Sequence, residues 1–529
     1  MLRLTNLSVP VDYTEASLRT LIEKKCGLAP DQLLAFSVVH RSVDARDRQN
    51  VHFVLSLDLK VKNEQALVKK RFLSAVSRPV TPALPAARFS RPPLVVGAGP
   101  AGLFAALTLA RAGANPVLIE RGRPVDERAR DVEKMAAEGL LVPESNIQFG
   151  EGGAGAFSDG KLTCGVKSPY LRSVLETFVA HGAPEEILVD RLPHIGTDRL
   201  RGVVASLREE IRSLGGTVLF ETRLEELILR GCRVEGAVLS HAGEKREFPT
   251  DTVLLCTGHS ARDTMQHLFS QGVRMAQKPF AVGVRIEHPR TFIDRAQYGS
   301  FAGHPALGAA SYKLVCHTPD GRGVYTFCMC PGGHVIAAAS HPGGVAVNGM
   351  SFHARDAENS NSALLVGVRT EDFGDSHPLA GFVLQRQIEK AAFDAAGGGF
   401  KAPAQRVEDF LAGRPSRGFG NVQPSYRPGV VPVDLRAILP VWITEDLRKG
   451  LRAMNTQLSG FAMPDAVLTA PETRSSSPVR LLRDGRYEAE DLSGLFPVGE
   501  GSGYSGGIVS SAIDGIAAAR ASIEKSNLL

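Results

Sequence analysis

The chain has 529 residues, of which 43% are hydrophobic and 22% are charged, values that are ordinary for globular proteins. The 61 Lys and Arg residues against 56 Asp and Glu leave a net charge of +5, which is too small to predict a strong polyanionic partner such as nucleic acid. The seven cysteines are thinly spread, which is unlike a disulfide framework. The first residues show no signal-peptide pattern, and no window reaches the about 18 apolar residues of a membrane span. We therefore expect a cytoplasmic protein without a membrane partner.

Residues 1–75 are predicted to form a separate small α/β unit. Three runs alternate as strands do and two have helical spacing: Leu2–Val11, Leu33–Val39 and Val51–Leu59, then Thr14–Lys25 and Asn63–Phe72. The β-α-β-β-α order suggests a ferredoxin-like domain that lacks one strand. Its basic residues form either a docking face for an electron-donor protein or a solvated surface: Lys24, Lys25, Lys60, Lys62, Lys69, Lys70 and Arg71. The proline-rich segment 76–93 is predicted to be a stiff linker.

The segment Leu94–Arg121 reads as a strand, a glycine-rich turn, a helix and a second strand that ends in an acid. Gly97, Gly99 and Gly102 have the G-x-G-x-x-G spacing, and Glu120 lies 18 residues beyond the last glycine. In such a turn the glycines permit a tight bend, close approach of a pyrophosphate, and close packing of helix on strand. We predict dinucleotide binding here, with Glu120 accepting hydrogen bonds from ribose hydroxyls. The polar stretch that follows carries basic residues that either face the diphosphate or are solvated: Arg123, Arg128, Arg130 and Lys134.

Gly150–Lys161, GEGGAGAFSDGK, has five glycines in twelve residues. So many glycines do not serve core packing, because each loses backbone entropy on folding. A loop of this kind lets the backbone approach a flat or phosphorylated ligand. The alternative is a flexible surface loop, but Phe149, Phe157 and Leu162 are placed to anchor it.

A second strand that runs into a glycine turn lies at Asp251–Gly258, and a helix opens after His259. It indicates a second crossing of the same doubly wound sheet. The elements between the two crossings are predicted to be a helix, a strand and a hairpin: Asp198–Leu214, Thr217–Phe220, and Leu224–Leu229 with Val234–Ser240.

From residue 280 to residue 470 the pattern changes. Strand-like runs separated by Gly/Pro/Asn-rich turns precede one clear helix: Ala281–Ile286, Val324–Cys328 and Val335–Ala339, then Gly381–Ala395. We interpret residues 280–470 as an inserted domain that supplies most of the substrate cavity.

Residues 471–529 return to the nucleotide-binding style. Leu495–Val498 is a short apolar strand, Gly499–Gly507 has five glycines in nine residues, and Ile508–Ala519 is an apolar helix. Such a turn brings backbone amides against an acceptor-rich ligand edge.

Three strand–turn–helix sites in this order resemble FAD-binding flavoproteins with the glutathione-reductase-type fold. Cys256-Thr257-Gly258 corresponds to the middle Ala-Thr-Gly-like turn of those proteins, and Gly499-Glu500 to their late Gly-Asp turn, with Glu in place of Asp. The resemblance is closer still to a family of FAD-dependent dehydrogenases that has its own C-terminal domain, and it runs from about residue 94 to residue 519. Seven segments carry it: NIQFGEGGAGAFSDGKL from Asn146, PHIGTDRL from Pro193, TGHSARD from Thr257, PFAVGVRIEHP from Pro279, FCMCPGG from Phe327, ETRSSSPVR from Glu472 and GEGSGYSGGIVSSAIDG from Gly499.

The resemblance implies an α/β fold in which a Rossmann-like FAD-binding domain, residues 94–279 and 471–529, is interrupted by a mixed α+β substrate domain, residues 280–470. It implies FAD bound non-covalently through the turns and the glycine-rich loop. The cofactor-binding residues that we predict are Gly97, Gly99, Pro100, Ala101, Gly102, Glu120, Arg121, Gly152, Gly153, Gly155, Gly160, Lys161, Thr257, Gly258, Gly499, Glu500, Gly506, Gly507 and Ile508.

Cys328 and Cys330, in FCMCPGG, are candidates for a redox-active thiol pair, because a strained disulfide is a reactive one. The alternative is that two small side chains lie buried on one face of a strand. A metal site made with His334 and His341 matches no standard zinc spacing, so no metal is predicted.

His259 is the best candidate for a general acid, because its turn should lie beside the cofactor and imidazole titrates near neutral pH. His288, His317 and His353 are further candidates that are as readily structural. Arg285 is a candidate for holding a carboxylate-bearing substrate, as is Arg474; for both, structural ion pairs are the alternative.

We therefore expect an FAD-dependent oxidoreductase that transfers hydride between a small organic substrate and FAD. NAD(P)H is a possible transient donor at the flavin face, because no second G-x-G-x-x-G unit is visible. The alternatives are a flavin-dependent monooxygenase, and a flavoprotein that acts on RNA or a protein partner. Flavin hydroxylases carry an Asp-Gly-x-x-Ser-x-x-Arg turn that TGHSARD matches only loosely, and halogenases carry a Trp-x-Trp-x-Ile-Pro segment, whereas this chain has one tryptophan, Trp442.

Overall fold

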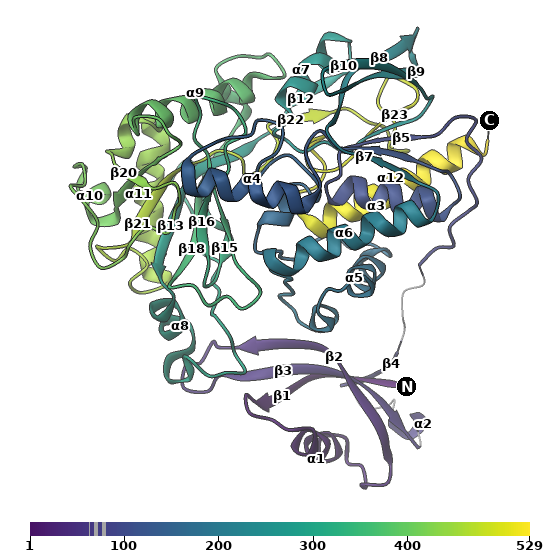
Figure 1. Ribbon diagram of the computed structural model, residues 1–529. Helices are drawn as coiled ribbons and strands as arrows, with labels where there is room; N and C mark the ends of the chain where they lie inside the picture. Colours follow the sequence, from purple (N-terminus) through teal and green to yellow (C-terminus); the bar gives the residue numbers. More distant parts are fainter. Residues whose placement is uncertain (63, 68–71, 77–80, 529) are drawn as a thin grey trace.

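The computed structural model describes residues 1–62, 64–67, 72–76 and 81–528, and it shows a mixed α/β protein. Figure 1 shows a small unit that contains the N-terminus at the bottom of the view, a sheet covered by α3, α6 and α12, and a second, larger sheet that carries α9 and α11. Among the residues that the structure describes, no helix is long and apolar enough to cross a membrane.

The N-terminal unit has the element order β-α-β-β-α-β, which is that of a ferredoxin-like motif. Its antiparallel sheet has the order β2-β3-β1-β4. The elements are β1 (Leu2–Pro10), α1 (Glu15–Cys26), β2 (Leu33–Asp44), β3 (His52–Val61), α2 (Glu64–Leu67) and β4 (Leu73–Ala75).

The strand β4 was not predicted, because three residues are too few to show an alternating pattern. The helix predicted over 63–72 was wrong at its end, where Phe72 already lies in the turn before β4. Residue 63 and residues 68–71, which include the basic Lys69, Lys70 and Arg71, lie outside the described part of the chain. The unit contacts the rest of the chain through Arg41, which donates to Asp190 at 2.7 and 3.1 Å.

The cofactor-type sheet has five parallel strands in the order β23-β11-β5-β6-β7. They are β5 (Leu94–Val96), β6 (Val117–Ile119), β7 (Thr217–Leu219), β11 (Val253–Leu255) and β23 (Leu495–Pro497). The chain runs outward from β5 to β7 and then returns to β11 on the other side of β5, so the strand order reverses between β5 and β11. In doubly wound sheets, ligands bind beyond the carboxyl ends of the strands at this point.

Four helices cover one face of this sheet: α3 (Pro100–Arg111), α5 (Leu171–Ala180), α6 (Thr197–Ser213) and α12 (Ile508–Ser526). The helices α3 and α12 pack closely because their contact is made by small residues, and a Cβ added to Gly515 would lie 2.1 Å from the carbonyl oxygen of Ala101. This packing places the first residues of both helices at the same edge of the sheet.

The other face carries a three-stranded antiparallel sheet in the order β10-β9-β8 and several shorter elements. They are β8 (Thr222–Arg230), β9 (Arg233–His241), β10 (Glu244–Pro249), α7 (Arg262–Ser270), and β12 (Met275–Gln277) paired with β22 (Val479–Leu481). The strand β10 was not predicted, because it is solvent-exposed and has no apolar alternation. The helix α4 (Val125–Glu138) follows β6.

The inserted region is built on a seven-stranded sheet in the order β14-β15-β18-β13-β21-β19-β20, antiparallel except at the β19–β20 edge. The strands are β13 (Phe280–Pro289), β14 (Val315–His317), β15 (Gly323–Cys330), β18 (Asn359–Val368), β19 (Ala402–Arg406), β20 (Val430–Pro432) and β21 (Val467–Glu472), with a separate hairpin of β16 (His334–Ala337) and β17 (Val347–Met350). Its helices are α8 (Arg290–Tyr298), α9 (Ala380–Ala395), α10 (Val407–Ala412) and α11 (Val441–Gln457). Short 3₁₀ turns lie along the whole chain at Ala154–Phe157, Glu185–Leu188, Gly299–Phe301, Thr370–Phe373 and Leu435–Ala437.

The strand β21 crosses the boundary that we predicted at residue 470. Its last residue, Glu472, pairs with Gly283 of β13 and therefore belongs to the seven-stranded sheet. The chain returns to the five-stranded sheet only at β23.

Candidate functional site

Three turns meet at the carboxyl edge of the five-stranded sheet, after β5, β11 and β23. A Cβ added to Gly97 in the first turn would lie 2.9 Å from the carbonyl oxygen of Cys256, which precedes the middle turn. One added to Gly501 in the late turn would lie 2.0 Å from that of Thr257. The turns are therefore in backbone contact, which only glycine permits at these two positions.

The first turn shows the physical roles that its spacing predicts. Gly97 has a φ of +101°, and a Cβ added to Gly102 would lie 1.8 Å from the carbonyl oxygen of Gly97. A Cβ on Gly99, in contrast, would meet nothing closer than the Cα of Gly153 at 3.9 Å. The helix α3 begins at Pro100 with no side-chain cap. Its first amides are therefore left for an anion.

The glycine-rich loop lies directly on this turn. A Cβ added to Gly153 would lie 3.1 Å from the Cα of Gly99, and one added to Gly155 would lie 3.2 Å from the side chain of Ile508. The amide of Gly152 donates to the first turn at the carbonyl of Ala98, at 2.8 Å. The structure thus brings the start of the loop together with the N-termini of α3 and α12.

Arg128 is buried beneath the glycine-rich loop and holds its backbone. It faces neither solvent nor the position expected for a diphosphate. Its side chain is 0% exposed and donates to the carbonyl oxygens of Asn146, Ile147, Gly150 and Glu151 at 2.8, 2.9, 3.2 and 2.6 Å. Burial lowers the pKa of Arg128 to about 10. The charged neighbours of this residue along α4 concealed its role in the sequence.

Glu120 is 6% exposed, and backbone amides surround its carboxylate. It accepts hydrogen bonds from Ala98, Gly122 and Gly150 at 2.8, 2.9 and 3.0 Å. A carboxylate offers about four lone-pair sites, so one remains for a ribose hydroxyl. Glu120 therefore ties the first turn to the glycine-rich loop, and its contact with a ribose stays a prediction.

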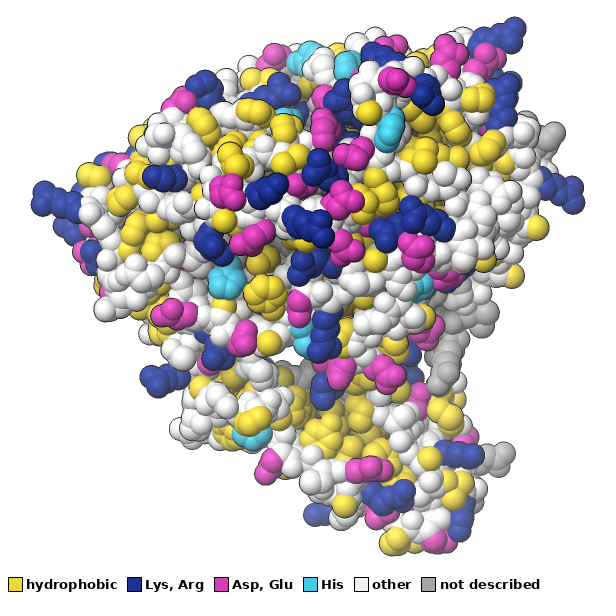
Figure 2. Space-filling model, in the orientation of Figure 1, with side chains coloured by type: hydrophobic (Ala, Val, Ile, Leu, Met, Phe, Trp, Pro, Cys, Tyr) yellow, Lys and Arg dark blue, Asp and Glu magenta, His cyan; other side chains and the backbone are white. Residues whose placement is uncertain are grey.

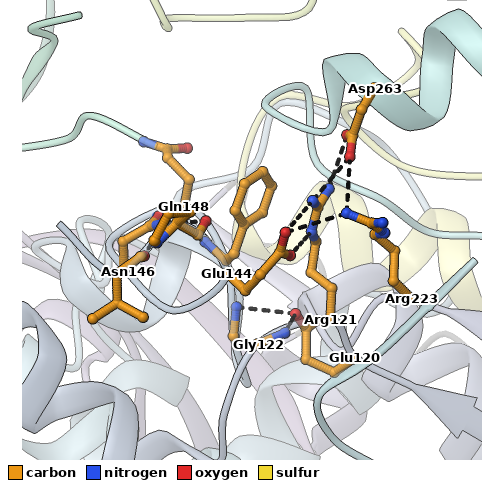
Figure 3. Close-up of polar contacts among 12 residues, drawn as sticks. Glu120, Arg121, Gly122, Glu144, Asn146, Gln148, Arg223 and Asp263 are labelled. Carbon is orange, nitrogen blue, oxygen red and sulfur yellow. Dashed lines mark hydrogen bonds and ion pairs between the residues drawn. The ribbon is translucent and has the colours of Figure 1, made fainter. Parts of the chain in front are cut away.

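Arg121 lies in an ion-pair cluster (Figure 3). Its guanidinium donates to Glu144 at 2.6 and 3.0 Å and to Asp263 at 2.9 Å through two nitrogens, and Arg223 lies 3.3 Å from Glu144 and 3.7 Å from Asp263. Burial lowers the pKa of Arg121, but the hydrogen bonds to the two carboxylates raise it above its usual value overall. The cluster fixes the middle turn against β6. A contact of Arg121 with a cofactor stays a prediction.

The middle and late turns are joined by His259 and Glu500. The Nδ1 of His259 lies 2.8 Å from both carboxylate oxygens of Glu500. The Nε2 of His259 and the Oγ1 of Thr257 are buried, and neither has a hydrogen-bond partner among the described residues. A Cβ added to Gly258 or to Gly506 would meet nothing within 4 Å, so both turns border open space.

The end of the glycine-rich loop reaches the inserted region instead of the first turn. The carbonyl of Gly160 accepts from the amide of Ile195 at 3.1 Å. Asp159 pairs with Arg355 at 2.5 Å, and the Nζ of Lys161 lies 3.9 Å from Asp159. The structure therefore separates Gly160 and Lys161 from the other loop residues that we predicted to contact the cofactor.

A buried pair of arginines connects the middle turn to the inserted region. Glu389 of α9 accepts from Arg262 at 2.8 and 2.9 Å and from Arg474 at 3.0 and 3.1 Å. Burial raises the pKa of Glu389, but the two arginines lower it well below its usual value overall. Arg474 also donates to Ser260 and Ser340 at 3.1 and 2.5 Å. Of the two interpretations that we gave for Arg474, the structure shows the ion pair.

Arg285 lies inside the seven-stranded sheet, where its side chain is 0% exposed. It donates to Glu472 at 3.2 Å, to Asn361 at 2.6 and 3.0 Å, and to the carbonyl of Cys328 at 2.9 Å, and one nitrogen lies 3.5 Å from the sulfur of Cys330. The structure thus brings Arg285 and the two cysteines together, and protein groups accept the hydrogen bonds of its guanidinium.

The remaining histidine candidates lie apart from one another. His288 is buried, with its Nε2 2.7 Å from the carbonyl of Phe461, and His317 is exposed on β14. His353 stacks on His194, with 5.2 Å between ring centroids. On the face shown in Figure 2, basic and acidic side chains are interspersed.

Comparisons with known proteins identify FAD as the ligand expected at the carboxyl edge of the five-stranded sheet. Residues 279–475 match the family model "FAD-dependent protein, C-terminal domain-like", residues 92–133 match "FAD binding domain", and residues 1–60 match a domain of unknown function, DUF8436. A protein of Clostridium beijerinckii described as uncharacterized is 43% identical over 533 residues, an alignment that covers 100% of this chain and 99% of that protein. The chain belongs to this family of FAD-dependent proteins. It is an FAD-dependent oxidoreductase, because a flavin carries the redox chemistry itself.

Solved structures that resemble the chain include flavoenzymes. A flavin-dependent brominase, Bmp2, is 11% identical, with 83% of this chain and 81% of that chain covered and a TM-score of 0.37. A geranylgeranyl bacteriochlorophyll reductase-like protein of Thermoplasma acidophilum is 12% identical, with 83% and 79% covered and a TM-score of 0.36. At these scores the likeness identifies neither substrate nor reaction.

The residues at the edge of the sheet fit FAD. The helix N-termini at Pro100 and at Ile508 have no side-chain cap and suit the diphosphate. The Oγ1 of Thr257 and the Nε2 of His259 are buried in the middle turn without a hydrogen-bond partner among the described residues, and a ligand rich in hydroxyl and ring polar groups would supply one. Glu120 retains one acceptor site beside the first turn.

Proposed function

We propose that this oxidoreductase transfers hydride between a small organic substrate and FAD, with NAD(P)H as a transient electron donor at the same edge of the sheet. The observation that carries the proposal is the His259–Glu500 pair, a buried imidazole between the middle and late turns whose Nε2 has no hydrogen-bond partner in the described part of the chain. When bound, the flavin supplies the hydride chemistry. The protein supplies binding, orientation and a proton at a defined atom.

The carboxylate of Glu500 sets the tautomer of His259. Because Glu500 only accepts, the Nδ1 of His259 carries the hydrogen and donates it, which leaves the Nε2 of the neutral ring as an acceptor. That nitrogen takes a proton from a substrate hydroxyl or amine as hydride leaves, and returns it in the reverse direction.

The inserted region is proposed to close the substrate space. Its Ser340 accepts from Arg474, which also donates to Ser260 in the middle turn, and its Arg355 reaches the end of the glycine-rich loop at Asp159. We also propose that the enzyme works in the reducing cytoplasm, because its cysteines are few and thinly spread. A protein donor at the N-terminal unit is the alternative source of electrons.

The test is anaerobic reduction of the FAD-loaded protein by NADH or NADPH, followed by stopped-flow absorbance of the flavin, and then admission of air with substrate candidates. We expect rapid reduction of the wild type. His259→Gln should slow the substrate half-reaction by about 10²–10⁴-fold with FAD binding retained, because proton transfer contributes about that much. Glu500→Gln should act in the same direction, and His317→Gln, at an exposed position, should match the wild type.

Three results would count against the proposal. Failure of the protein to bind added FAD would remove its basis. Equal rates in His259→Gln and His317→Gln would show that His259 moves no proton. A product that gains an oxygen atom from air would make the enzyme a monooxygenase.

A further inference from the structure

The strand β15 carries a β-bulge at its two cysteines. Phe327 pairs with Ala363 and Cys330 pairs with Asn361 on β18, so three steps along β15 oppose two along its neighbour. Cys328 has a φ of +41°, a left-handed conformation that is strained for a residue other than glycine. The alternative interpretation, with both side chains on one face of a regular strand, does not describe this bulge. Bulges and left-handed residues of this kind gather at active sites.

The bulge places the Cys330 thiol against the backbone of Cys328. In a regular strand, two residues separated by one other are about 6.6 Å apart, which is close to the upper limit of about 6.8 Å between the Cα atoms of a disulfide. Here the thiol of Cys330 donates back to the carbonyl of Cys328 at 3.3 Å. The bulge therefore departs from the spacing that keeps two such cysteines near this limit in a flat strand.

Both basic and acidic side chains lie around the pair. The interaction with Cys330, opposed by burial and assisted by Lys161 and Arg285, lowers the pKa of Cys328 overall, while the interaction with Cys328 and burial raise the pKa of Cys330. The thiolate is the nucleophilic form of cysteine. The charged and titratable groups around Cys328 come from four parts of the fold: Cys330 on β15, Arg285 on β13, Glu472 on β21, and Lys161 with Asp159 at the end of the glycine-rich loop.

The two cysteines differ in access. Cys328 is partly exposed and follows Phe327, which is 41% exposed, whereas Cys330 is fully buried. A solvent-accessible thiolate beside a buried thiol is the arrangement of an attacking and a resolving cysteine. The neighbouring Lys161 belongs to the same loop whose other end lies on the first turn, so the pair borders the loop that we predict to hold the cofactor.

We propose that Cys328 and Cys330 form a second two-electron centre, a dithiol–disulfide pair that reduces a disulfide substrate and is itself reduced by the FAD of the same chain. The inference rests on the proposed function, because reduced FAD is the reductant that it needs. This second centre takes a substrate of its own, a disulfide that is small or lies on an exposed loop, since Cys328 and the neighbouring Phe327 are accessible whereas Cys330 is buried.

The reaction balances in two exchanges. The sulfur of Cys328 attacks one sulfur of the substrate disulfide, the substrate S–S bond breaks, and the second substrate sulfur leaves as a thiolate that takes a proton from water. Cys330 then loses its proton and attacks the sulfur of Cys328, which forms the Cys328–Cys330 bond and releases the first substrate sulfur. The substrate gains two electrons and two protons, and reduced FAD returns two electrons to the pair.

The first experiment does not depend on the flavin. The full chain is equilibrated in mixtures of reduced and oxidised dithiothreitol, alkylated, digested and mapped by mass. We expect the peptide with both cysteines to lose two hydrogen atoms in the wild type and in Cys316→Ser, whose cysteine lies on the neighbouring β14. In Cys330→Ser treated with oxidised glutathione, one glutathione should remain attached to Cys328 as a mixed disulfide. In the wild type, alkylation of Cys328 should have its midpoint well below the about 8.5 of an ordinary thiol.

The second experiment counts electrons in the FAD-loaded protein. The wild type and Cys316→Ser, first oxidised by the disulfide substrate, should take up twice as many reducing equivalents per FAD from dithionite as Cys328→Ser and Cys330→Ser. Equal uptake in all four proteins, together with no disulfide in the peptide map, would overturn the inference even if NAD(P)H reduces the flavin. A disulfide in the map of a protein that binds no FAD would instead contradict the proposed function and the flavin as reductant.

Discussion

Replacing Arg128 by methionine should release the glycine-rich loop. The guanidinium makes four hydrogen bonds to carbonyl oxygens between residues 146 and 151. Each hydrogen bond to a charged group contributes about 1.5–3 kcal/mol. Burial lowers the pKa of Arg128 to about 10 from the usual 12.5, so desolvation of the charge offsets part of this gain. Breaking a buried charged network by removing one partner costs about 3–5 kcal/mol, and we expect a loss of this size here.

The assay is urea unfolding followed by circular dichroism, with a parallel titration of FAD. Arg128→Met should lower the free energy of unfolding by at least about 3 kcal/mol, a large part of the about 5–15 kcal/mol of an ordinary domain, and should weaken FAD binding. Arg130→Met is the matched control, because Arg130 is exposed two residues further along the same helix and should change stability by no more than about 0.5 kcal/mol. Equal unfolding midpoints for the two variants would refute the role of Arg128 as the clamp of the loop.

Two further predictions concern single positions. Gly102→Ala should abolish co-purification of FAD, because the added Cβ would lie 1.8 Å from the carbonyl oxygen of Gly97. The control is Gly202→Ala in α6, where nothing lies within 4 Å of the added Cβ; it should keep FAD and raise the free energy of unfolding by up to about 1 kcal/mol. A Gly102→Ala protein that purifies with bound FAD would contradict the prediction. Burial lowers the pKa of His288 to about 4 from the usual 6.5. As the pH falls, the unfolded chain therefore protonates this imidazole before the native state does, and the free energy of unfolding decreases by up to about 3 kcal/mol between pH 6.5 and pH 4. His288→Gln, which keeps a donor for the carbonyl of Phe461 but does not titrate, should show a shallower loss of stability in urea unfolding across this range; an unchanged slope would be inconsistent with a buried neutral His288.

The parts that could be predicted from the sequence are those in which local pattern and tertiary position coincide. The fully buried strands β5, β11 and β23 read as short apolar runs, and the glycines after each run have no other use than a tight turn or a close backbone approach. The strands β4 and β10 could not be predicted, because one has three residues and the other faces solvent on both sides.

The sequence by itself determined the cofactor and the edge of the sheet that serves it, because turn glycines, uncapped helix starts and buried strands leave their mark within a few residues. Only the tertiary structure decided what the charged side chains do. The carboxylate of Glu120 accepts hydrogen bonds mainly from backbone amides, Arg121 pairs with two carboxylates, and Arg285 lies fully buried against a bulged strand. These partners come from segments up to 187 residues away in the chain. The hydrogen bonds that neutralise a buried charge depend on distances that exist only after the segments have packed, so no local pattern announces them.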